Sequence, residues 1–259
     1  MKIIESRSNP LYKQLFKWQS SAGRRDEPVL LEGVHLCEAY LALGLQPQFA
    51  LFDHARIEEP QLARLITQLP DQVCCTLSGS LLGNLSNVDT DQGVLFVVKP
   101  SNPPLPEKLT GNMLWLDRIQ DPGNVGTLLR TAAAAGVTRV LASTGTAALW
   151  SPKVLRSGQG VHFGLRLHEH VDLVAATRQL EVPLIVTTLG EATDLFNSTL
   201  PPQAAWVFGH EGQGVSQALV DLAAYRLKIE HAKTVESLNV TAAAAICLFE
   251  QRRQHRPLA

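Results

Sequence analysis

The chain has 259 residues, 45% of them hydrophobic and 18% charged, which is the composition of a globular protein with room for two modest domains. No apolar run approaches the roughly 18–20 residues that cross a bilayer, so no membrane partner is expected. The net charge of −1 argues against a general polyanion binder, and the N-terminus MKIIESRSNP has no apolar signal core, so we expect a cytoplasmic protein.

The first part of the chain alternates short apolar strands with helices. Helices are predicted at 9–20, 34–43 and 60–69, and strands at 28–32, 48–53, 72–77 and 93–98. This alternation indicates a small α/β domain at 1–99. The proline-rich stretch that follows indicates a linker at 100–110.

The remaining chain, 111–259, continues the alternation with strands that are more fully apolar. Strands are predicted at 113–117, 137–143, 183–189, 204–209 and 226–229, and helices at 123–135, from 151 onward and at 238–253. Fully apolar strands are typical of a parallel sheet that is covered on both faces. The last helix carries an apolar stripe formed by Ala242, Ala245, Ile246 and Phe249.

Basic residues gather near both ends of the chain. The first group includes Lys13, Lys17, Arg24 and Arg25, and the second consists of Arg252, Arg253 and Arg256. Taken alone, these groups are explained by a solvated helix face and an ordinary basic tail. Phosphate binding is the alternative, and it needs support from other motifs.

The four cysteines, Cys37, Cys74, Cys75 and Cys247, have neither metal-ligand nor disulfide spacing. Cys74 and Cys75 are adjacent within an apolar run that is predicted to be a strand. We therefore expect reduced core cysteines and no metal site.

Three polar loops follow predicted apolar strands, at 121–132, 207–216 and 236–245. In an open α/β sheet, ligands bind where strands end. Each loop alone has an ordinary explanation, as a strand-to-helix turn, a glycine turn and a helix cap. Those explanations leave out Arg130, which lies on an otherwise apolar helix, and Glu211, which lies on a glycine-flanked loop.

The order, spacing and residue types of the three loops resemble the SpoU (TrmH-like) class of SPOUT RNA ribose methyltransferases over 112–253. The stretch SPKVLRSGQGVHF at 151–163 looks like a further motif of that family. The N-terminal part is similar to its L30e-like substrate-binding domain through Ser8-Asn9-Pro10, Leu31-Glu32-Gly33 and Gln92-Gly93. The resemblance implies an L30e-like α/β domain followed by a SPOUT α/β domain with a deep trefoil knot.

The resemblance also implies a reaction and a site. S-adenosylmethionine (SAM) would donate a methyl group to a ribose 2′-hydroxyl of rRNA or tRNA, in a homodimer, with no DNA partner. The catalytic set carried over is Asn124, Arg130, Glu211, Ser237 and Asn239. The cofactor set is Thr188, Gly209, Ile229 and Leu238. The residues expected to bind RNA are Lys13, Lys17, Arg24 and Arg25.

Some positions depart from the family pattern. Glu230-His231 replaces the usual Pro-Met, Lys233 stands where a glycine is usual, and Ser157–Gly160 is rearranged. These departures bear on the shape of the cofactor loop and remove no member of the catalytic set. Whether Arg130 takes the hydroxyl proton or only stabilises developing charge stays open, because a free arginine is a poor base.

Two other functions remain as alternatives. The first is a catalytically inactive RNA-binding protein, such as a ribosome assembly factor, on the same fold. The second is a nucleotide-dependent oxidoreductase, which is disfavoured because GHEGQG at 209–214 does not match GxGxxG.

Overall fold

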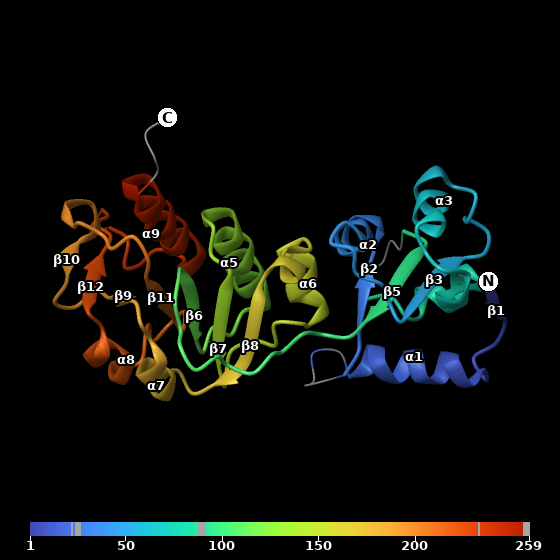
Figure 1. The fold of residues 1–259 in the computed structure, drawn as a ribbon, viewed down its shortest axis with the longest axis horizontal. Coiled ribbons are helices and arrows are strands. Elements are labelled where there is room, and N and C mark those ends of the chain that lie inside the picture. The colour runs from blue at the N-terminus through green and yellow to red at the C-terminus, as the bar shows by residue number, and fades with distance from the viewer. Residues whose placement is uncertain (22, 24–26, 88–91, 233, 256–259) are drawn as a thin grey trace. The chain divides into compact units, whose positions relative to one another are not determined.

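The computed structural model describes residues 1–21, 23, 27–87, 92–232 and 234–255, and Figure 1 shows the fold. Two compact units are present. Residues 1–101 and 150–163 form the first, and residues 102–149 and 164–259 form the second. Contacts therefore group 150–163 with the first unit, although the sequence interpretation counted this segment in the second domain. The predicted domain borders at 99 and 111 stay a prediction.

The first unit contains a five-stranded sheet of order β1-β4-β3-β5-β2. Strands β1, β4 and β3 run parallel, whereas β5 is antiparallel to both of its neighbours. The strands are β1 (Lys2–Ile4), β2 (Val29–Glu32), β3 (Phe49–Asp53), β4 (Cys74–Leu77) and β5 (Val94–Val98). The helices are α1 (Pro10–Ser20), α2 (Val34–Leu41), α3 (Pro60–Thr67), α4 (Gly79–Gly83) and α6 (Pro152–Gly158).

Helix α1 shows how the sequence starts an element in this unit. The side chain of Asn9 accepts a hydrogen bond from the Leu11 backbone N–H at 2.9 Å, and Pro10 occupies the first helical position. Tyr12 and Leu15 lie on its buried face and join the core beneath the sheet. The opposite face is left to solvent, and that face carries the basic residues.

The second unit contains a seven-stranded parallel sheet of order β10-β12-β9-β11-β6-β7-β8. The strands are β6 (Met113–Asp117), β7 (Arg139–Ser143), β8 (Arg166–Val171), β9 (Leu184–Thr187), β10 (Thr193–Asp194), β11 (Ala205–Gly209) and β12 (Tyr225–Lys228). The helices are α5 (Pro122–Ala135), α7 (Leu173–Ala176), α8 (Gln217–Leu222) and α9 (Val240–His255).

Helices cover both faces of this sheet, as the apolar strands predicted. Trp206 lies on the face covered by α9, where its ring N–H donates to the Gln251 side chain at 2.8 Å. Trp115 points to the other face and packs with Leu173 of α7 and Leu219 of α8. In Figure 1, α5 and α9 lie together at the top of this unit and α7 and α8 at its lower edge.

Helix α9 buries a face that the sequence did not single out. Its buried residues are Ala244, Cys247, Leu248, Glu250 and Gln251. The predicted apolar stripe lies outside this face, with Ala242 and Phe249 exposed and Ala245 and Ile246 partly exposed. The helix therefore has apolar residues on two faces, and the described chain covers only one of them.

Most predicted elements are confirmed, and those that were missed are short or polar. The sequence interpretation had no helix at α4, α7 or α8 and no strand at β1, β8 or β10. β8 has the sequence RLHEHV and forms an edge of the sheet, where charged residues are common and full burial is not required. All four cysteines are buried and unpaired.

Candidate active site

Four neighbouring parallel strands bring the predicted loops to one edge of the second sheet. In the order β12-β9-β11-β6, all four strands run in the same direction, so their carboxyl ends share an edge. The connections after these strands begin at residues 229, 188, 210 and 118. The sequence-predicted loops therefore meet, as expected for a ligand site of a parallel α/β sheet.

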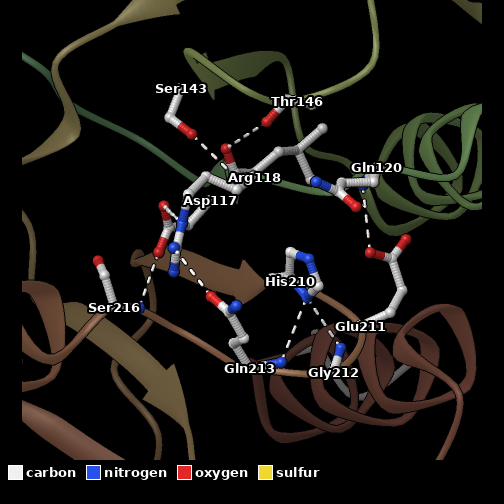
Figure 2. Close-up of polar contacts among 11 residues, drawn as sticks. Asp117, Arg118, Gln120, Ser143, Thr146, His210, Glu211, Gly212, Gln213 and Ser216 are labelled. Atoms are coloured by element: carbon white, nitrogen blue, oxygen red, sulfur yellow. Dashed lines mark hydrogen bonds and ion pairs between the residues drawn. The ribbon is translucent and has the colours of Figure 1, made fainter.

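Glu211 lies at the centre of the polar contacts at this edge. One carboxylate oxygen accepts hydrogen bonds from the Asn124 side-chain amide at 3.0 Å and from the Asp121 backbone N–H at 3.1 Å. The other oxygen accepts from the Gln120 backbone N–H at 3.2 Å, a contact drawn in Figure 2. These donors fix the carboxylate against the start of α5.

The hydrogen bonds also stabilise the ionised form of Glu211. Burial raises the pKa of the carboxyl group, but the donors from Asn124 and from the backbone outweigh burial, so the pKa lies below its ordinary value. Glu211 is therefore ionised at neutral pH and acts as an acceptor only.

Asn124 and Asn239 connect this carboxylate to the start of α9. The Asn239 amide donates to the Asn124 side-chain oxygen at 3.5 Å. The Asn239 oxygen accepts from the backbone N–H and the hydroxyl of Thr241, at 2.8 and 2.6 Å. Asn239 is thus the residue that caps α9, and the same side chain reaches the Glu211–Asn124 pair.

The other two members of the predicted catalytic set are not hydrogen-bonded to these three. Arg130 is exposed on α5, six residues after Asn124, which corresponds to about 9 Å along the helix axis. Ser237 is exposed in the segment before α9. Neither side chain forms a hydrogen bond or ion pair with any residue that the structure describes.

The predicted cofactor residues follow three adjacent strands. Thr188 follows β9, and its hydroxyl accepts a hydrogen bond from the Gly190 backbone N–H at 3.2 Å. Ile229 follows β12, and its carbonyl oxygen accepts from the His231 ring at 2.8 Å. Leu238 is partly buried just ahead of α9.

Gly209, the last residue of β11, has a structural reason to be glycine. A Cβ at this position would lie 2.2 Å from the backbone nitrogen of Val215 and 2.2 Å from the carbonyl carbon of Gly214. The loop after β11 therefore folds back onto the strand at a distance that admits no side chain. We call residues 209–216 the glycine loop.

Several residues that hold the glycine loop were not predicted from the sequence. A carboxylate oxygen of Asp117 accepts from the Ser216 backbone N–H at 2.7 Å, and the Arg118 guanidinium donates to the Gln213 side-chain oxygen at 3.2 Å. Inside the loop, the His210 ring nitrogen Nδ1 accepts the backbone N–H groups of Gly212 and Gln213 (Figure 2). The available signal was the acidic end of the strand MLWLD at 113–117.

The predicted RNA-binding residues are only partly described. Lys13 and Lys17 are exposed on α1, one helical turn apart. Arg24 and Arg25 lie outside the described residues, as do Lys233 and Arg256. In the C-terminal group, Arg252 donates to the Ala135 carbonyl oxygen at the end of α5, at 3.1 Å.

The described residues offer neither a metal site nor a membrane-spanning helix. Within the described ranges, no three His, Cys, Asp or Glu side chains come together in a way that would hold a metal ion. No helix in the described part of the chain is both long enough and apolar enough to span a membrane.

Comparison with known proteins identifies the family. The model of the SpoU rRNA Methylase family matches residues 111–249. An uncharacterised tRNA/rRNA methyltransferase of Synechocystis is 35% identical over 97% of this chain and 93% of its own length. The 23S rRNA guanosine-2′-O-methyltransferase RlmP of Bacillus subtilis is 32% identical over 97% of this chain and 100% of its own length.

A solved structure is similar over nearly the whole chain. It is the SpoU methyltransferase AviRb of Streptomyces viridochromogenes with its cofactor AdoMet, which is 25% identical, covers 95% of this chain and 98% of its own, and superposes with a TM-score of 0.80. The chain belongs to the SpoU rRNA methylase family.

Proposed function

We propose that this protein transfers a methyl group from SAM to a ribose 2′-hydroxyl of ribosomal RNA. The observation that carries the proposal is the hydrogen-bonded set Glu211–Asn124–Asn239 at the shared edge of four parallel strands. Relatives that match nearly the whole chain are named as RNA methyltransferases, one of them as a 23S rRNA 2′-O-methyltransferase. A cytoplasmic location belongs to the same proposal, since rRNA is the substrate.

The loops after β9, β11 and β12 have the chemistry that SAM requires. Their exposed backbone groups include those of Gly190, Gly212 and Gly214, which carry no side chain of their own, and the space beside Gly214 is open. Leu189 and Val235 are 68% and 48% exposed and supply apolar surface for an adenosine or a methionine chain. When bound, SAM supplies a methyl group on a positively charged sulfur.

In the proposed site each residue has a distinct task. Glu211 fixes the side chain of Asn124, which otherwise has freedom to rotate, and thereby orients the groups at the start of α5. Arg130 would stabilise the negative charge that develops on the ribose oxygen as its proton passes to solvent, while the methyl group that this oxygen takes leaves the sulfur of SAM, which becomes a neutral thioether. Ser237 positions the hydroxyl from the segment ahead of α9.

We include a homodimer in the proposal because Arg130 has no hydrogen-bond partner among the described residues and the apolar stripe of α9 is not covered by them. The stripe Ala242, Ala245, Ile246 and Phe249 is exposed or partly exposed, and Arg130 and Ala134 are exposed on α5, which packs beside α9. A second copy seated on these faces would bury the stripe and place Arg130 in a shared site. The trefoil knot belongs to the same proposal, supported by the return of the chain from β12 to α9 beside α5.

Mapping of 2′-O-methylated nucleotides tests the function. RNA from cells with and without the protein is compared, and the missing modification is then restored in vitro with pure protein, radiolabelled SAM and the unmodified RNA. A lost and restored site in rRNA is the expected result. A site found only in tRNA would change the substrate, and RNA binding without transfer to any cellular RNA would favour the inactive assembly factor.

A further inference from the structure

We propose that Arg118 is a positioning residue of this enzyme, which holds the glycine loop in the arrangement that presents Gly209 and Glu211. This inference rests on the proposed function, because it assigns the loop to cofactor binding and methyl transfer. Arg118 lies outside the set that the family resemblance supplied. Its role follows from an unusual backbone conformation and from its side-chain partners.

The backbone of Arg118 adopts a conformation that favours glycine. Its φ is 60°, and among the described residues only Gln159 and His170 share a positive φ without being glycine. The backbone N–H of Arg118 donates to the Ser143 hydroxyl at 2.9 Å, which ties this conformation to the neighbouring strand β7 (Figure 2). A disfavoured conformation at a site persists when surrounding contacts determine it.

In this left-handed conformation the Arg118 side chain contacts two residues at once, Asp117 at the end of β6 and Gln213 in the glycine loop. Its Nε atom lies 3.3 Å from a carboxylate oxygen of Asp117, whose side chain is 6% exposed. Its terminal nitrogen donates to Gln213 at 3.2 Å. Because the other Asp117 oxygen accepts from the Ser216 backbone, the Asp117–Arg118 pair holds the glycine loop at two points.

The opposite flank of the loop is held by the residues that follow in sequence. Gln120, Asp121 and Asn124 donate to Glu211, as described above. The glycine loop is therefore held on one flank through Gln213 and on the other through Glu211, and both sets of contacts come from residues 117–124. Loss of the Arg118 contact would free Gln213 and, through the turn formed with His210, alter the position of Gly209 and Glu211.

Substitution by glycine separates the side chain from the backbone conformation. Arg118→Gly keeps the positive φ at no steric cost and removes the side-chain contacts to Asp117 and Gln213, together with the packing of the Arg118 side chain beside Gly145. His170→Gly is the matched control, because it replaces the positive-φ residue of edge strand β8 (φ 57°), which is exposed. Melting temperature, SAM affinity by calorimetry, steady-state kinetics and hydrogen exchange of residues 209–216 are measured for both variants.

We expect Arg118→Gly to weaken SAM binding or to lower kcat by about tenfold, with a melting temperature near that of the wild type. Amide exchange in the glycine loop should become faster in this variant and remain unchanged in His170→Gly. Gln213→Ala should act in the same direction, and combining it with Arg118→Gly should add little, because both variants lack the same Arg118–Gln213 hydrogen bond. Additive effects would contradict the proposed link.

The outcomes also separate this inference from the proposed function. Wild-type kinetics, SAM affinity and loop exchange in a folded Arg118→Gly variant would overturn the positioning role while the methyltransferase proposal stands. A wild type that methylates no RNA would refute the proposed function, and the loop exchange of Arg118→Gly would still decide whether Arg118 holds the loop. If Arg118→Gly and His170→Gly changed the kinetics and the loop exchange equally, the cause would be the glycine backbone and not the lost Arg118 contacts, and the inference would be overturned.

Discussion

The two parts of the candidate site differ in how completely their polar groups are partnered. Around the glycine loop, the Glu211 carboxylate has three donors and Asn124 has partners on both sides of its amide. On the outer faces of α5 and α9, Arg130 has no partner in the described chain and Phe249 is 45% exposed. The difference indicates a region that is organised before any ligand binds and a region that is completed by RNA or a second copy.

The largest expected effect comes from the unpartnered arginine. Arg130→Ala should lower methyl transfer by at least about 10²-fold, the scale of a lost charge contact in the transition state, while SAM affinity stays near the wild-type value. Arg130→Lys should restore little, because lysine lacks the planar fork of donors. Single-turnover transfer of labelled methyl and calorimetry with SAM measure the two quantities.

Arg178→Ala is the control, because Arg178 is another exposed arginine of the same unit. Unchanged methyl transfer in Arg130→Ala would show that the active site is assigned wrongly.

The organised region is tested at its centre. Glu211→Gln keeps one acceptor oxygen but turns a donor toward a backbone N–H, so turnover should fall about tenfold. Because the pKa of Glu211 is lowered by its donors, the contribution of its ionised form is present above the ordinary pKa and is lost as pH falls through the lowered value. The wild type should therefore lose activity on acidification through this group, and the variant should lack that component. Exposed Glu107→Gln is the matched control, and full activity in Glu211→Gln would contradict the assignment of Glu211.

The outer face of α9 is tested by its oligomeric state. Phe249→Asp introduces a charge into the proposed interface and should convert the dimer into a monomer of 28.2 kDa. Light scattering at micromolar concentration measures the mass. Leu222→Asp changes an equally exposed apolar residue on α8 and should leave the mass unaltered. A monomeric wild type would remove the dimer from the proposal.

The basic face of α1 should contribute a smaller effect. Replacing Lys13 and Lys17 by alanine should weaken RNA binding and reduce the slope of its salt dependence by about one unit per lost phosphate contact. Binding is measured across a range of salt concentrations, and Lys99→Ala/Lys108→Ala serves as the control of equal charge. An unaltered slope would assign these lysines on α1 to structure alone.

The smallest effect is expected at the inner face of α9. Hydrogen bonds from Arg253 lower the pKa of Glu250 to about 2. The stabilisation is present above the ordinary value of about 4.5 and is lost as pH falls toward 2, so unfolding should become easier over this range. In Glu250→Gln, the melting temperature should depend less on pH between these values, and an identical dependence would contradict the assignment.

The sequence predicted the organised part of the site better than the rest. Asn124 lies in the first turn of α5, and Glu211 and Asn239 lie in connections that follow strands; parallel strands bring the segments after them to one edge. Arg118 was missed, because its role depends on a positive φ and on Gln213, 95 residues away in sequence. Neither property has a local sequence signal.

The elements show a similar division. Apolar strands such as β6 and β11 were predicted almost to the residue, whereas the charged edge strand β8 was not. For α9, alanines on most sides of the helix leave the buried face undetermined by periodicity alone. Contacts with α5 and β11 decide which side is buried.

The capping of α9 by Asn239 couples the completion of the fold to the completion of the site. One side chain begins the last helix through its oxygen and reaches Asn124 through its amide nitrogen. A chain in which this helix has not yet docked therefore lacks one residue of the candidate site. During synthesis, the segment that supplies Asn239 emerges after the other residues of the candidate site, so we expect unfinished chains to transfer no methyl group until the final helix is in place.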